Sequence, residues 1–335
     1  MSGPRRAAVL GSPITHSLSP VLHRAAYEEL GLREWTYDRF DVTEADLEHF
    51  LGGLGTGWAG LSITMPLKRA IIPLLDSVSP AAASVDTVNT VLPAGPGRWR
   101  GDNTDIPGLV AALRERGVTR VPGASVLGAG ATASSALAAL ARMRVPEVTV
   151  YVRGPERAAQ MRGWGERLGV PVRTAPWEEA ADGLRAPLVI STTPAGATDA
   201  LAHHVPAAGR PLGTLFDVVY DPWPTPLGSA WAARDGALLG GLDLLVHQAV
   251  LQVEAMTGRS PAPLAAMRKA GEAALAPRTA PVSRPVGGRE PEPRSGHDRI
   301  GTDPRTGVRG AGRDGRGERG QDPRNGENRE HEEHR

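Results

Sequence analysis

Short β-rich runs alternate with helical patterns from the N-terminus to about residue 240, and this alternation constrains the fold more than any other feature of the sequence. Neighbouring parallel strands need a crossover connection, which is usually a helix, so the alternation predicts stacked βαβ units and a mostly parallel sheet. The expected fold class is therefore α/β. The predicted strands are residues 6–10, 36–40, 60–64, 87–91, 125–127, 148–152, 188–191, 215–220 and 237–239.

A boundary between two sets of strands is expected near Asp105. There a polar strand end gives way to an amphipathic run at residues 109–116, which Gly117 ends. A new set of strands then begins. We therefore expect a two-lobe architecture, with a first lobe over residues 1–104, a second over 105–241, and a helix at 242–258 that returns to the first.

The composition changes after about Ala276. From there Arg, Gly, Glu, Asp and Pro dominate, and no Phe, Trp or Tyr is present. Such a segment buries too little apolar surface to offset its ordering entropy, so we predict that residues 276–335 form a disordered tail. Its basic and acidic residues are interleaved, which favours a solvating extension over an RNA-binding arm.

The overall composition excludes several classes of function. The chain has no cysteine, which rules out disulfides and thiolate chemistry and favours a reducing cytoplasm. The net charge of +1 gives no electrostatic reason to bind nucleic acid, and no apolar run approaches the ~20 residues of a membrane span. His203 and His204 are adjacent and lack a carboxylate partner set, so a surface loop is favoured over a metal site. We expect a cytoplasmic monomer or homodimer without metal, nucleic-acid or membrane partners.

Lys68 and Asp105 each close a short polar motif at the end of a predicted strand, at residues 62–68 and 101–105. An ammonium and a carboxylate in one pocket form a proton-transfer couple, because each holds the other's charge state and orientation while a substrate hydroxyl lies between them. Such a pair provides the catalytic groups that an alcohol dehydrogenase without a metal needs. An ordinary surface ion pair is the alternative interpretation.

A strand, a glycine turn and an Ala-rich helical stretch follow one another at residues 126–143. This geometry lets backbone N–H groups and a helix N-terminus meet a pyrophosphate, as in Rossmann-like lobes. The turn matches G-x-G-x-x-A, in which Ala also allows close packing of the helix on the sheet. The turn consists of Gly128, Ala129, Gly130, Ala131, Thr132 and Ala133.

The cofactor preference is predicted from the next strand, which ends at Arg153. An acidic residue about 20 positions after the turn would bind the ribose of NAD, whereas a guanidinium there suits the 2′-phosphate of NADP. Arg157, one helical turn further on, is a second candidate for the same phosphate. We predict NADP as the cofactor, with NAD as the alternative. If the two arginines bind no phosphate, they are simply solvated side chains at the end of a strand.

Two serines precede the first predicted helix, at residues 21–30. Ser19 is a natural N-cap and Pro20 a natural first helical residue. With Ser17, the hydroxyl of Ser19 also makes a neutral site for a small carboxylate in front of free helix N–H groups.

In their order these motifs resemble the shikimate dehydrogenase family. The resemblance runs from about residue 7 to about residue 258 and leaves only the tail uncovered. The matching elements are His16 with Ser17, Leu18, Ser19 and Pro20 (S-x-S-P); Thr64, Pro66 and Lys68 (V-T-x-P-x-K); Val88, Asn89 and Thr90 (V-N-T); Asn103, Thr104 and Asp105 (N-T-D); Tyr220, Pro222, Thr225, Pro226 and Leu227 (Y-x-P-x-x-T-P-L); and Gly241, Leu245, Val246, Gln248 and Ala249 (G-x-x-x-L-V-x-Q-A).

The resemblance implies an N-terminal substrate-binding domain at 1–104, completed by 242–258, and a Rossmann-like NADP-binding domain at 105–241. It implies that Lys68 and Asp105 handle the proton of a ring hydroxyl while hydride passes to or from nicotinamide. The implied substrate residues are Ser17, Ser19, Thr64, Asn89, Asp105, Tyr220 and Gln248. The implied cofactor residues are the turn residues 128–133, Arg153, Arg157, Thr192, Val218, Gly241 and Leu244.

This sequence departs from the family pattern at four places. Ser62 stands where the family usually has Asn, so we expect a shorter or water-mediated hydrogen bond near Lys68. Val152 and Gly154 flank Arg153 where the family reads N-R-T, which removes two polar contacts to a 2′-phosphate. The other departures are Ser191, Thr192, Thr193 and Pro194 in place of N-A-T or N-A-S, and Leu244 in place of Met.

The expected reaction is the reversible, NADP-dependent reduction of 3-dehydroshikimate to shikimate, a step of chorismate and aromatic amino acid biosynthesis. Three alternatives stay open. One is a quinate or aminoshikimate dehydrogenase that uses NAD or NADP, and another is a non-catalytic shikimate-binding homologue. A folate-linked dehydrogenase is the third, and the paired Ser17 and Ser19 disfavour it because they suit a compact carboxylate better than a pterin.

Overall fold

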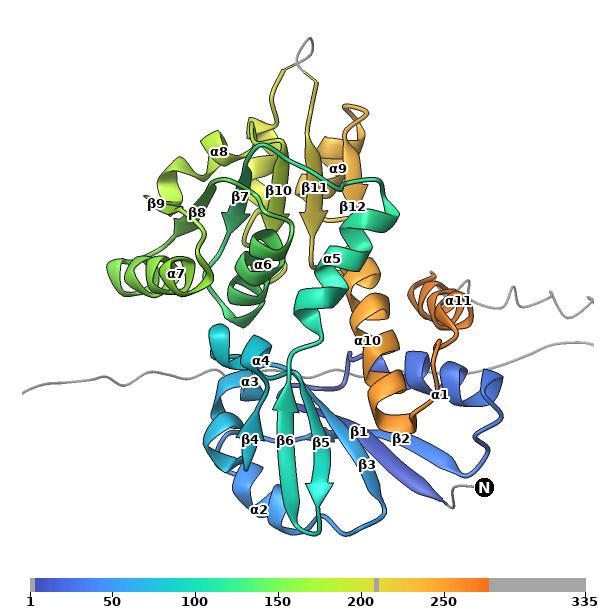
Figure 1. Cartoon of the computed structure of the whole chain (residues 1–335). Coiled ribbons are helices and arrows are strands. Elements are labelled where there is room, and N and C mark those ends of the chain that lie inside the picture. Colours follow the sequence, from blue (N-terminus) through green and yellow to red (C-terminus); the bar gives the residue numbers. More distant parts are fainter. Residues whose placement is uncertain (1–3, 208–210, 277–335) are drawn as a thin grey trace, which may run out of the picture. The chain divides into compact units, whose positions relative to one another are not determined.

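The computed structural model describes residues 4–207 and 211–276, and the predicted tail beyond Ala276 lies outside the described residues. Two six-stranded sheets form within this part of the chain, with helices beside each sheet (Figure 1). The α/β fold class is confirmed. Among these residues, no helix combines the length and the apolar character that a membrane crossing needs.

The first sheet has the strand order β2-β1-β3-β5-β6-β4, and it is mixed rather than mostly parallel. β1, β2 and β3 are parallel, whereas β5 runs antiparallel to both β3 and β6. The hairpin forms because Gly97 takes a positive φ of 65° between β5 and β6. The strands are β1 Arg5–Gly11, β2 Trp35–Asp41, β3 Trp58–Ile63, β4 Ser77–Val78, β5 Thr90–Gly95 and β6 Arg98–Asp102.

The predicted strand at 87–91 is wrong at its start, because β5 begins only at Thr90. The backbone oxygen of Thr87 accepts a hydrogen bond from Nδ2 of Asn103 at 2.9 Å, so it bonds a side chain and not a neighbouring strand. β4, β6 and β9 were not predicted at all. β6 carries two arginines and an aspartate, so its sequence lacks the apolar signal of a buried strand.

The second sheet is parallel throughout, with the order β12-β11-β10-β7-β8-β9 expected of a Rossmann-like lobe. The predicted strand at 215–220 ends earlier, at Asp217. The carboxylate of Asp217 accepts hydrogen bonds from the backbone N–H of Val219 (3.3 Å) and from Oγ1 of Thr225 (2.8 Å), which turns the chain away from the sheet. The strands are β7 Ala124–Leu127, β8 Val148–Val152, β9 Val172–Pro176, β10 Leu188–Ser191, β11 Thr214–Asp217 and β12 Ala237–Leu239.

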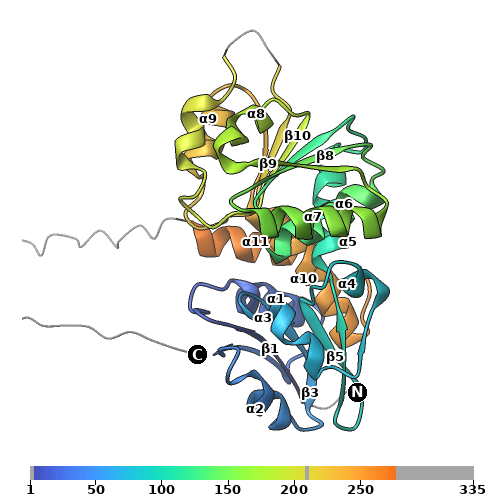
Figure 2. The same cartoon turned by 90° about the vertical axis from the view of Figure 1, so that its left-hand side faces the viewer.

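Helices cover both faces of the second sheet (Figures 1 and 2). Alternate residues along a strand face opposite sides. Val126 packs in one apolar cluster with α5, α6 and α7, whereas its neighbour Leu127 packs in another with α8 and α9. These helices are α5 Asp105–Glu115, α6 Ala131–Arg142, α7 Pro155–Leu168, α8 Ala180–Gly183 and α9 Pro226–Ala232, with short 3-10 turns at Trp177–Glu179 and Asp199–His204.

One detail of the second lobe corrects the sequence predictions. His203 and His204 are exposed but lie in the 3-10 turn Asp199–His204 rather than in a loop. Among the described residues, no group of three or more His, Asp or Glu side chains could hold a metal ion. The division of the chain near residue 104 stays a proposal, supported by the separation of β1 to β6 from β7 to β12 in the two sheets.

The first sheet is flanked by α1 Ser19–Glu29, α2 Leu47–Gly52, α3 Leu67–Ala70, α4 Pro80–Ser84 and the 3-10 turn Ile72–Leu74. The prediction that Ser19 is the N-cap of α1 is wrong. The helix begins one residue earlier, so Leu18 is the N-cap, Ser19 is the first helical residue and Pro20 the second. Proline fits there because that N–H group has no partner within a helix.

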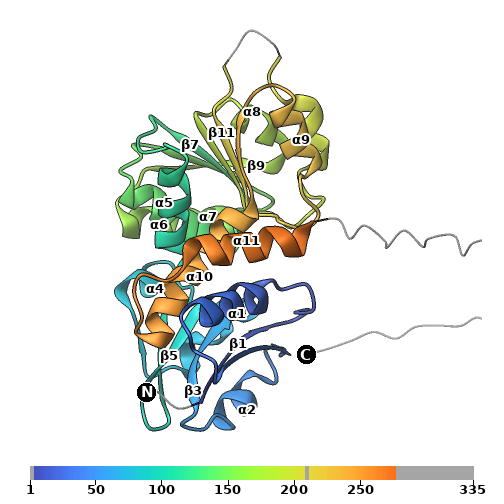
Figure 3. The ribbon, with the colours of Figure 1, turned by 90° about the vertical axis from the view of Figure 1, so that its right-hand side faces the viewer.

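Two C-terminal helices follow the second sheet. α10 Gly241–Thr257 contacts α5 of the second lobe and also α1, β3 and β5 of the first. The expected return of this helix to the first lobe stays a proposal, which the contacts with α1, β3 and β5 support. α11 Leu264–Leu275 was not predicted and lies against α1 and α10 (Figure 3). Its two buried residues are Met267 and Gly271, and a Cβ on Gly271 would come within 2.7 Å of Leu242, so α11 packs closely at that position.

His23 on α1 makes the stability of the fold depend on pH. Its ring is fully buried and stacks on Tyr37 with 3.9 Å between ring centroids, and burial lowers the pKa of His23 to about 4. In the unfolded chain the pKa is near 6.5, so between those values the unfolded chain binds more protons. We expect this group to lower the free energy of unfolding by ~3 kcal/mol as the pH falls from about 6.5 to about 4.

Urea unfolding at both ends of this pH range tests the expectation. The other titrating groups are shared by the unsubstituted chain and His23→Leu, so their contribution cancels in the comparison. The fall in unfolding free energy should be smaller in His23→Leu by about the amount assigned to His23. Equal pH slopes in the two proteins would contradict a neutral buried imidazole at this position.

Candidate active site

A pocket of about 270 Å³ brings together all the residues that the sequence predicted for catalysis and for substrate. They come from the start of α1 and the residues before it, from α3, α5 and α10, and from three connecting segments: β3 to α3, α4 to β5, and β11 to α9. Parts of the cofactor prediction also reach the pocket, through Thr132, Val218, Gly241 and Leu244. The predicted catalytic and substrate residues on its wall are Ser17, Ser19, Thr64, Lys68, Asn89, Asp105, Tyr220 and Gln248.

Lys68 and Asp105 form an ion pair in this pocket, with 2.6 Å between Nζ and Oδ2. Their side chains are only 13% and 6% exposed, so water screens the pair weakly. Lys68 lies on α3, whereas Asp105 is the first residue of α5, where the helix N-terminus favours a negative charge. The second carboxylate oxygen, Oδ1, accepts a hydrogen bond from Nδ2 of Asn89 at 2.8 Å.

Asn89 is itself held by the segment that precedes α5. Its Oδ1 accepts hydrogen bonds from the backbone N–H of Thr104 and from Oγ1 of Thr90, both at 2.8 Å. Gln248 on α10 donates from Nε2 to the backbone oxygen of Leu245 at 2.8 Å, and its Oε1 lies 3.4 Å from Nδ2 of Asn89. The polar groups beside Asp105 are therefore fixed before any ligand enters.

The opposite end of the pocket carries hydroxyl groups and no formal positive charge. Oγ of Ser17 accepts a hydrogen bond from the backbone N–H of Ser19 at 3.3 Å, and Ser19 is buried. Tyr220 follows β11, and burial raises the pKa of Tyr220, so it stays a neutral donor. Neutral donors that converge at the start of α1 can bind a small carboxylate reversibly.

The glycine turn between β7 and α6 has room for a dinucleotide. Gly128 has a φ of +106°, and a Cβ there would lie 2.9 Å from Oγ1 of Thr192, so only glycine fits. Gly130 faces open space, and α6 begins next to it without a side-chain cap, which leaves its first N–H groups for a ligand. Oγ1 of Thr193 is buried without a hydrogen-bond partner among the described residues.

Gly241 closes the other side of the cofactor region. A Cβ at Gly241 would lie 2.1 Å from the backbone oxygen of Val218, so the loop after β11 and the start of α10 touch directly. These observations fit a bound pyrophosphate and nicotinamide along the glycine turn, Thr192, Val218 and Gly241.

Arg153 and Arg157 lie away from the pocket wall, at the N-terminal end of α7. Both are exposed, and the guanidinium of Arg153 stands over the Trp177 ring, with its Cζ 5.2 Å from the centroid. Arg157 donates from Nη1 to Oε1 of Gln160 at 3.0 Å. Two guanidinium groups beside a helix N-terminus suit a phosphate, which keeps the predicted role of both as a proposal.

Ser62, Gln252 and Tyr37 form a part of the site that the sequence prediction missed. The expectation that Ser62 makes a hydrogen bond near Lys68 shorter or water-mediated stays a prediction. Its Oγ accepts from the hydroxyl of Tyr37 at 2.6 Å and donates to Oε1 of Gln252 at 2.7 Å. The only sequence signal was the spacing of Gln252, one helical turn after Gln248.

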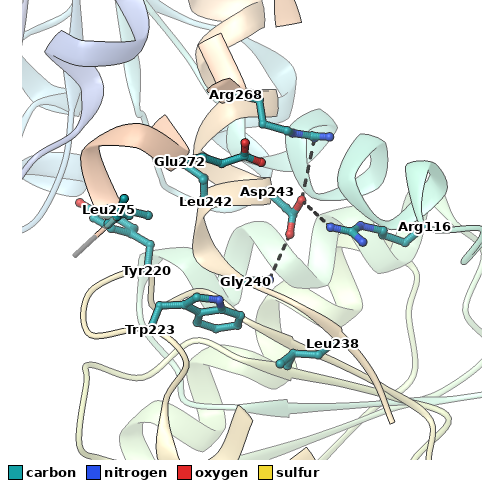
Figure 4. A pocket seen from close by; sticks show the side chains of 11 residues that line it. Arg116, Tyr220, Trp223, Leu238, Gly240, Leu242, Asp243, Arg268, Glu272 and Leu275 are labelled. Carbon is teal, nitrogen blue, oxygen red and sulfur yellow. Dashed lines mark hydrogen bonds and ion pairs between the residues drawn. The ribbon is translucent and has the colours of Figure 1, made fainter. Parts of the chain in front are cut away.

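A larger pocket of about 540 Å³ shares Tyr220 with this site but has none of the other predicted residues (Figure 4). Three of its charged side chains, those of Arg116, Asp243 and Arg268, form ion pairs. Asp243 accepts from the backbone N–H of Gly240 at 3.1 Å and lies 3.5 Å from Arg116 and 3.9 Å from Arg268 (Figure 4). This network fixes the start of α10, so we assign the pocket a structural role.

A parallel sheet with a dinucleotide-sized glycine turn, next to a shielded lysine and carboxylate pair, defines a nucleotide-dependent oxidoreductase. Family models agree with this class. The description "Shikimate dehydrogenase substrate binding domain" matches residues 9–91, and "Shikimate 5'-dehydrogenase C-terminal domain" matches residues 241–270.

Curated relatives and solved structures cover most of the chain. A shikimate dehydrogenase (NADP(+)) of Thermus thermophilus is 38% identical over 271 residues, which are 81% of this chain and 98% of that protein. One of Paramagnetospirillum magneticum is 36% identical over 78% of this chain and 96% of that protein. The crystal structure of Mycobacterium tuberculosis shikimate dehydrogenase is 42% identical, with a TM-score of 0.73 over 81% of this chain and 100% of that one. The chain belongs to the shikimate dehydrogenase family.

Proposed function

We propose that this chain catalyses the reversible, NADP-dependent reduction of 3-dehydroshikimate to shikimate. The observation that carries the proposal is the Lys68–Asp105 pair, 2.6 Å apart, on the wall of a pocket lined by the predicted substrate residues. Further support comes from a Thermus thermophilus shikimate 5-dehydrogenase solved in complex with NADP(H) and shikimate, which is 35% identical with a TM-score of 0.71 over 81% of this chain. The reaction belongs to chorismate and aromatic amino acid biosynthesis.

Lys68 and Asp105 hold and move the proton of the reacting hydroxyl. Lys68 and Asp105 both line the pocket, and the ammonium bonds the carboxylate, so Lys68 is placed to give a proton to a forming alkoxide or to take one from the alcohol. NADP, when bound, supplies or accepts the hydride. Asn89 keeps Oδ1 of Asp105 occupied, which leaves Oδ2 directed at Lys68.

The substrate carboxylate is assigned to Ser17, Ser19 and Tyr220, and the ring hydroxyls to Thr64, Asn89, Asp105 and Gln248. Apart from the carboxylate of Asp105 these groups are neutral, and they come from different elements to line one pocket. A site that bonds each hydroxyl rejects analogues that lack one. The cofactor pyrophosphate is assigned to the glycine turn, its 2′-phosphate to Arg153 and Arg157, and its nicotinamide end to Thr192, Val218, Gly241 and Leu244. The fit of the turn and of Gly241 supports this assignment.

A spectrophotometric assay of the full chain tests the proposal. Shikimate should reduce NADP faster than quinate does, because the site is built to bond the hydroxyls of shikimate. With shikimate, NADP should be reduced faster than NAD, because the site offers two arginines for a 2′-phosphate. A protein that reduces NAD with quinate and leaves shikimate with NADP unchanged overturns the assignment.

Quinate with NAD is the second candidate function. It is favoured by the quinate dehydrogenase of Corynebacterium glutamicum, solved with NAD, which is 27% identical with a TM-score of 0.71 over 81% of this chain. The relatives of higher identity are named for shikimate, which makes this the weaker candidate. A cytoplasmic location and a monomeric or homodimeric state remain expectations that accompany the proposed function.

A further inference from the structure

A buried chain of hydrogen bonds runs from β2 to the proposed catalytic carboxylate. The hydroxyl of Tyr37 bonds Ser62, and Ser62 bonds Gln252 on α10. Nε2 of Gln252 donates to the backbone oxygen of Asn89 at 3.0 Å and to Oγ1 of Thr90 at 2.9 Å. Tyr37, Ser62, Gln252 and Thr90 are at most 4% exposed, so water does not compete for these bonds.

Three groups in this chain have no choice of role, and they fix the direction of every other bond. The ionised carboxylate of Asp105 only accepts, so Asn89 turns its Nδ2 toward it. The backbone N–H of Thr104 only donates, so Oδ1 of Asn89 faces that side. The backbone oxygen of Asn89 only accepts, so Gln252 presents Nε2 to it.

The hydroxyls of Thr90 and Ser62 can then complete the chain in one consistent direction, while Oγ1 of Thr104 lies 3.2 Å from that of Thr90 as a further partner. Thr90 receives a proton from Gln252 and gives its own to Oδ1 of Asn89. Ser62 gives its proton to Oε1 of Gln252 and receives one from Tyr37. Asp105 and the backbone N–H of Thr104 thus set the orientation of the Asn89 amide, and a chain of bonds that ends at Tyr37 supports it through Thr90.

We propose that Gln252 is a positioning residue of the catalytic pair, which acts through Thr90 and Asn89 to hold Asp105 against Lys68. This inference rests on the proposed function and adds residues to it. Without Gln252, the backbone oxygen of Asn89 loses a donor, and Thr90 loses the donor that directs its own proton to Oδ1 of Asn89. Asp105 and the backbone N–H of Thr104 still orient the Asn89 amide, but with fewer supporting bonds it holds the carboxylate less rigidly.

Gln252→Met tests the proposal, because methionine has similar length but no hydrogen-bonding amide. We expect kcat to fall by about 10-fold, since a displaced catalytic group costs up to about 10²-fold in rate. The KM values for the acid and for the cofactor should change by less than about threefold, because the change acts on the step and not on the ligands. Val253→Ala is the matched control, since Val253 is fully buried on the same helix and packs only in an apolar cluster.

Tyr37→Phe supplies a second, graded variant. It removes only the far end of the chain and keeps the ring stacked on His23, so kcat should fall by about two- to threefold. In the double variant Tyr37→Phe with Gln252→Met, kcat should equal that of Gln252→Met alone, because the chain is already broken. Independent effects that multiply would overturn a shared route to Asp105.

The remaining outcomes separate this inference from the proposed function. If Gln252→Met and Val253→Ala have the same kcat and similar melting temperatures, the positioning role is overturned. A raised KM for the acid with unchanged kcat also overturns it, because that marks a direct contact with substrate. The variants are compared on whichever acid and cofactor the unsubstituted chain turns over, so a failure with shikimate and NADP counts only against the proposed function. A chain inactive with shikimate and with quinate overturns both.

Discussion

Lys68→Ala is expected to lower kcat by about 10² to 10⁴-fold, the range for loss of a general acid or base. The reason lies in the geometry, since Lys68 lines the pocket and its Nζ lies 2.6 Å from Oδ2 of Asp105, the other member of the proposed proton-transfer pair. The KM for shikimate should change only modestly, because its proposed carboxylate ligands are elsewhere in the pocket. Steady-state kinetics with shikimate and NADP measure both quantities.

The control must separate lost chemistry from lost structure. Removal of Lys68 leaves Asp105 buried without its ion-pair partner, which destabilises a protein even when the active site is intact. Melting temperature and equilibrium binding of shikimate are therefore measured on the same preparation. Arg69→Ala is the matched variant in α3, because Arg69 stands 4.9 Å from the Trp164 ring centroid and not on the pocket wall. Turnover by Lys68→Ala equal to that of Arg69→Ala would refute the catalytic assignment.

Five of the six strands of the second sheet followed from the sequence because they are short, apolar and separated by helices, whereas β9 was missed. Val148–Val152 and Leu188–Ser191 were predicted with the bounds that the structure has, and both are buried on the two faces of a parallel sheet. The first sheet was harder to predict, since β6 pairs through its backbone while its side chains alternate between exposed arginines and the buried Trp99. An antiparallel hairpin of that kind depends on a local turn and carries no run of apolar residues.

The site was predictable where a motif stands at the end of a strand or at the start of a helix. Lys68 and Asp105 were found this way, because parallel strands end at one edge of a sheet and bring such motifs together. Gln252 was not predicted as a site residue. Its function in the structure depends on Ser62 and Thr90, which reach it only after β3, β5 and α10 have packed, and no local pattern encodes contacts between segments so far apart.

Arg153→Ala combined with Arg157→Ala is expected to change the cofactor preference. Each hydrogen bond to a charged group contributes about 1.5–3 kcal/mol, and exposure brings the value toward the lower end. Loss of both guanidinium groups should therefore raise the KM for NADP by about 10²-fold. The KM for NAD should stay within about threefold, because NAD lacks the 2′-phosphate. Initial rates with both cofactors at saturating shikimate measure the ratio.

The control for this pair is Arg162→Ala, which removes an exposed arginine from the same helix. Arg162 donates from Nη1 to Oγ1 of Thr174 at 2.7 Å, further along α7 than the first turn that carries Arg157. A general loss of positive charge on α7 would raise the KM for NADP in this variant too, whereas a phosphate site at the start of the helix leaves it unchanged. The guanidinium of Arg153 also stacks on the Trp177 ring. A rise in the KM for NADP in the single variant Arg153→Ala would show that this guanidinium leaves the ring to bind the phosphate. Equal KM values for NADP in the double variant and in Arg162→Ala would assign the 2′-phosphate to other residues and leave the proton-transfer pair untouched.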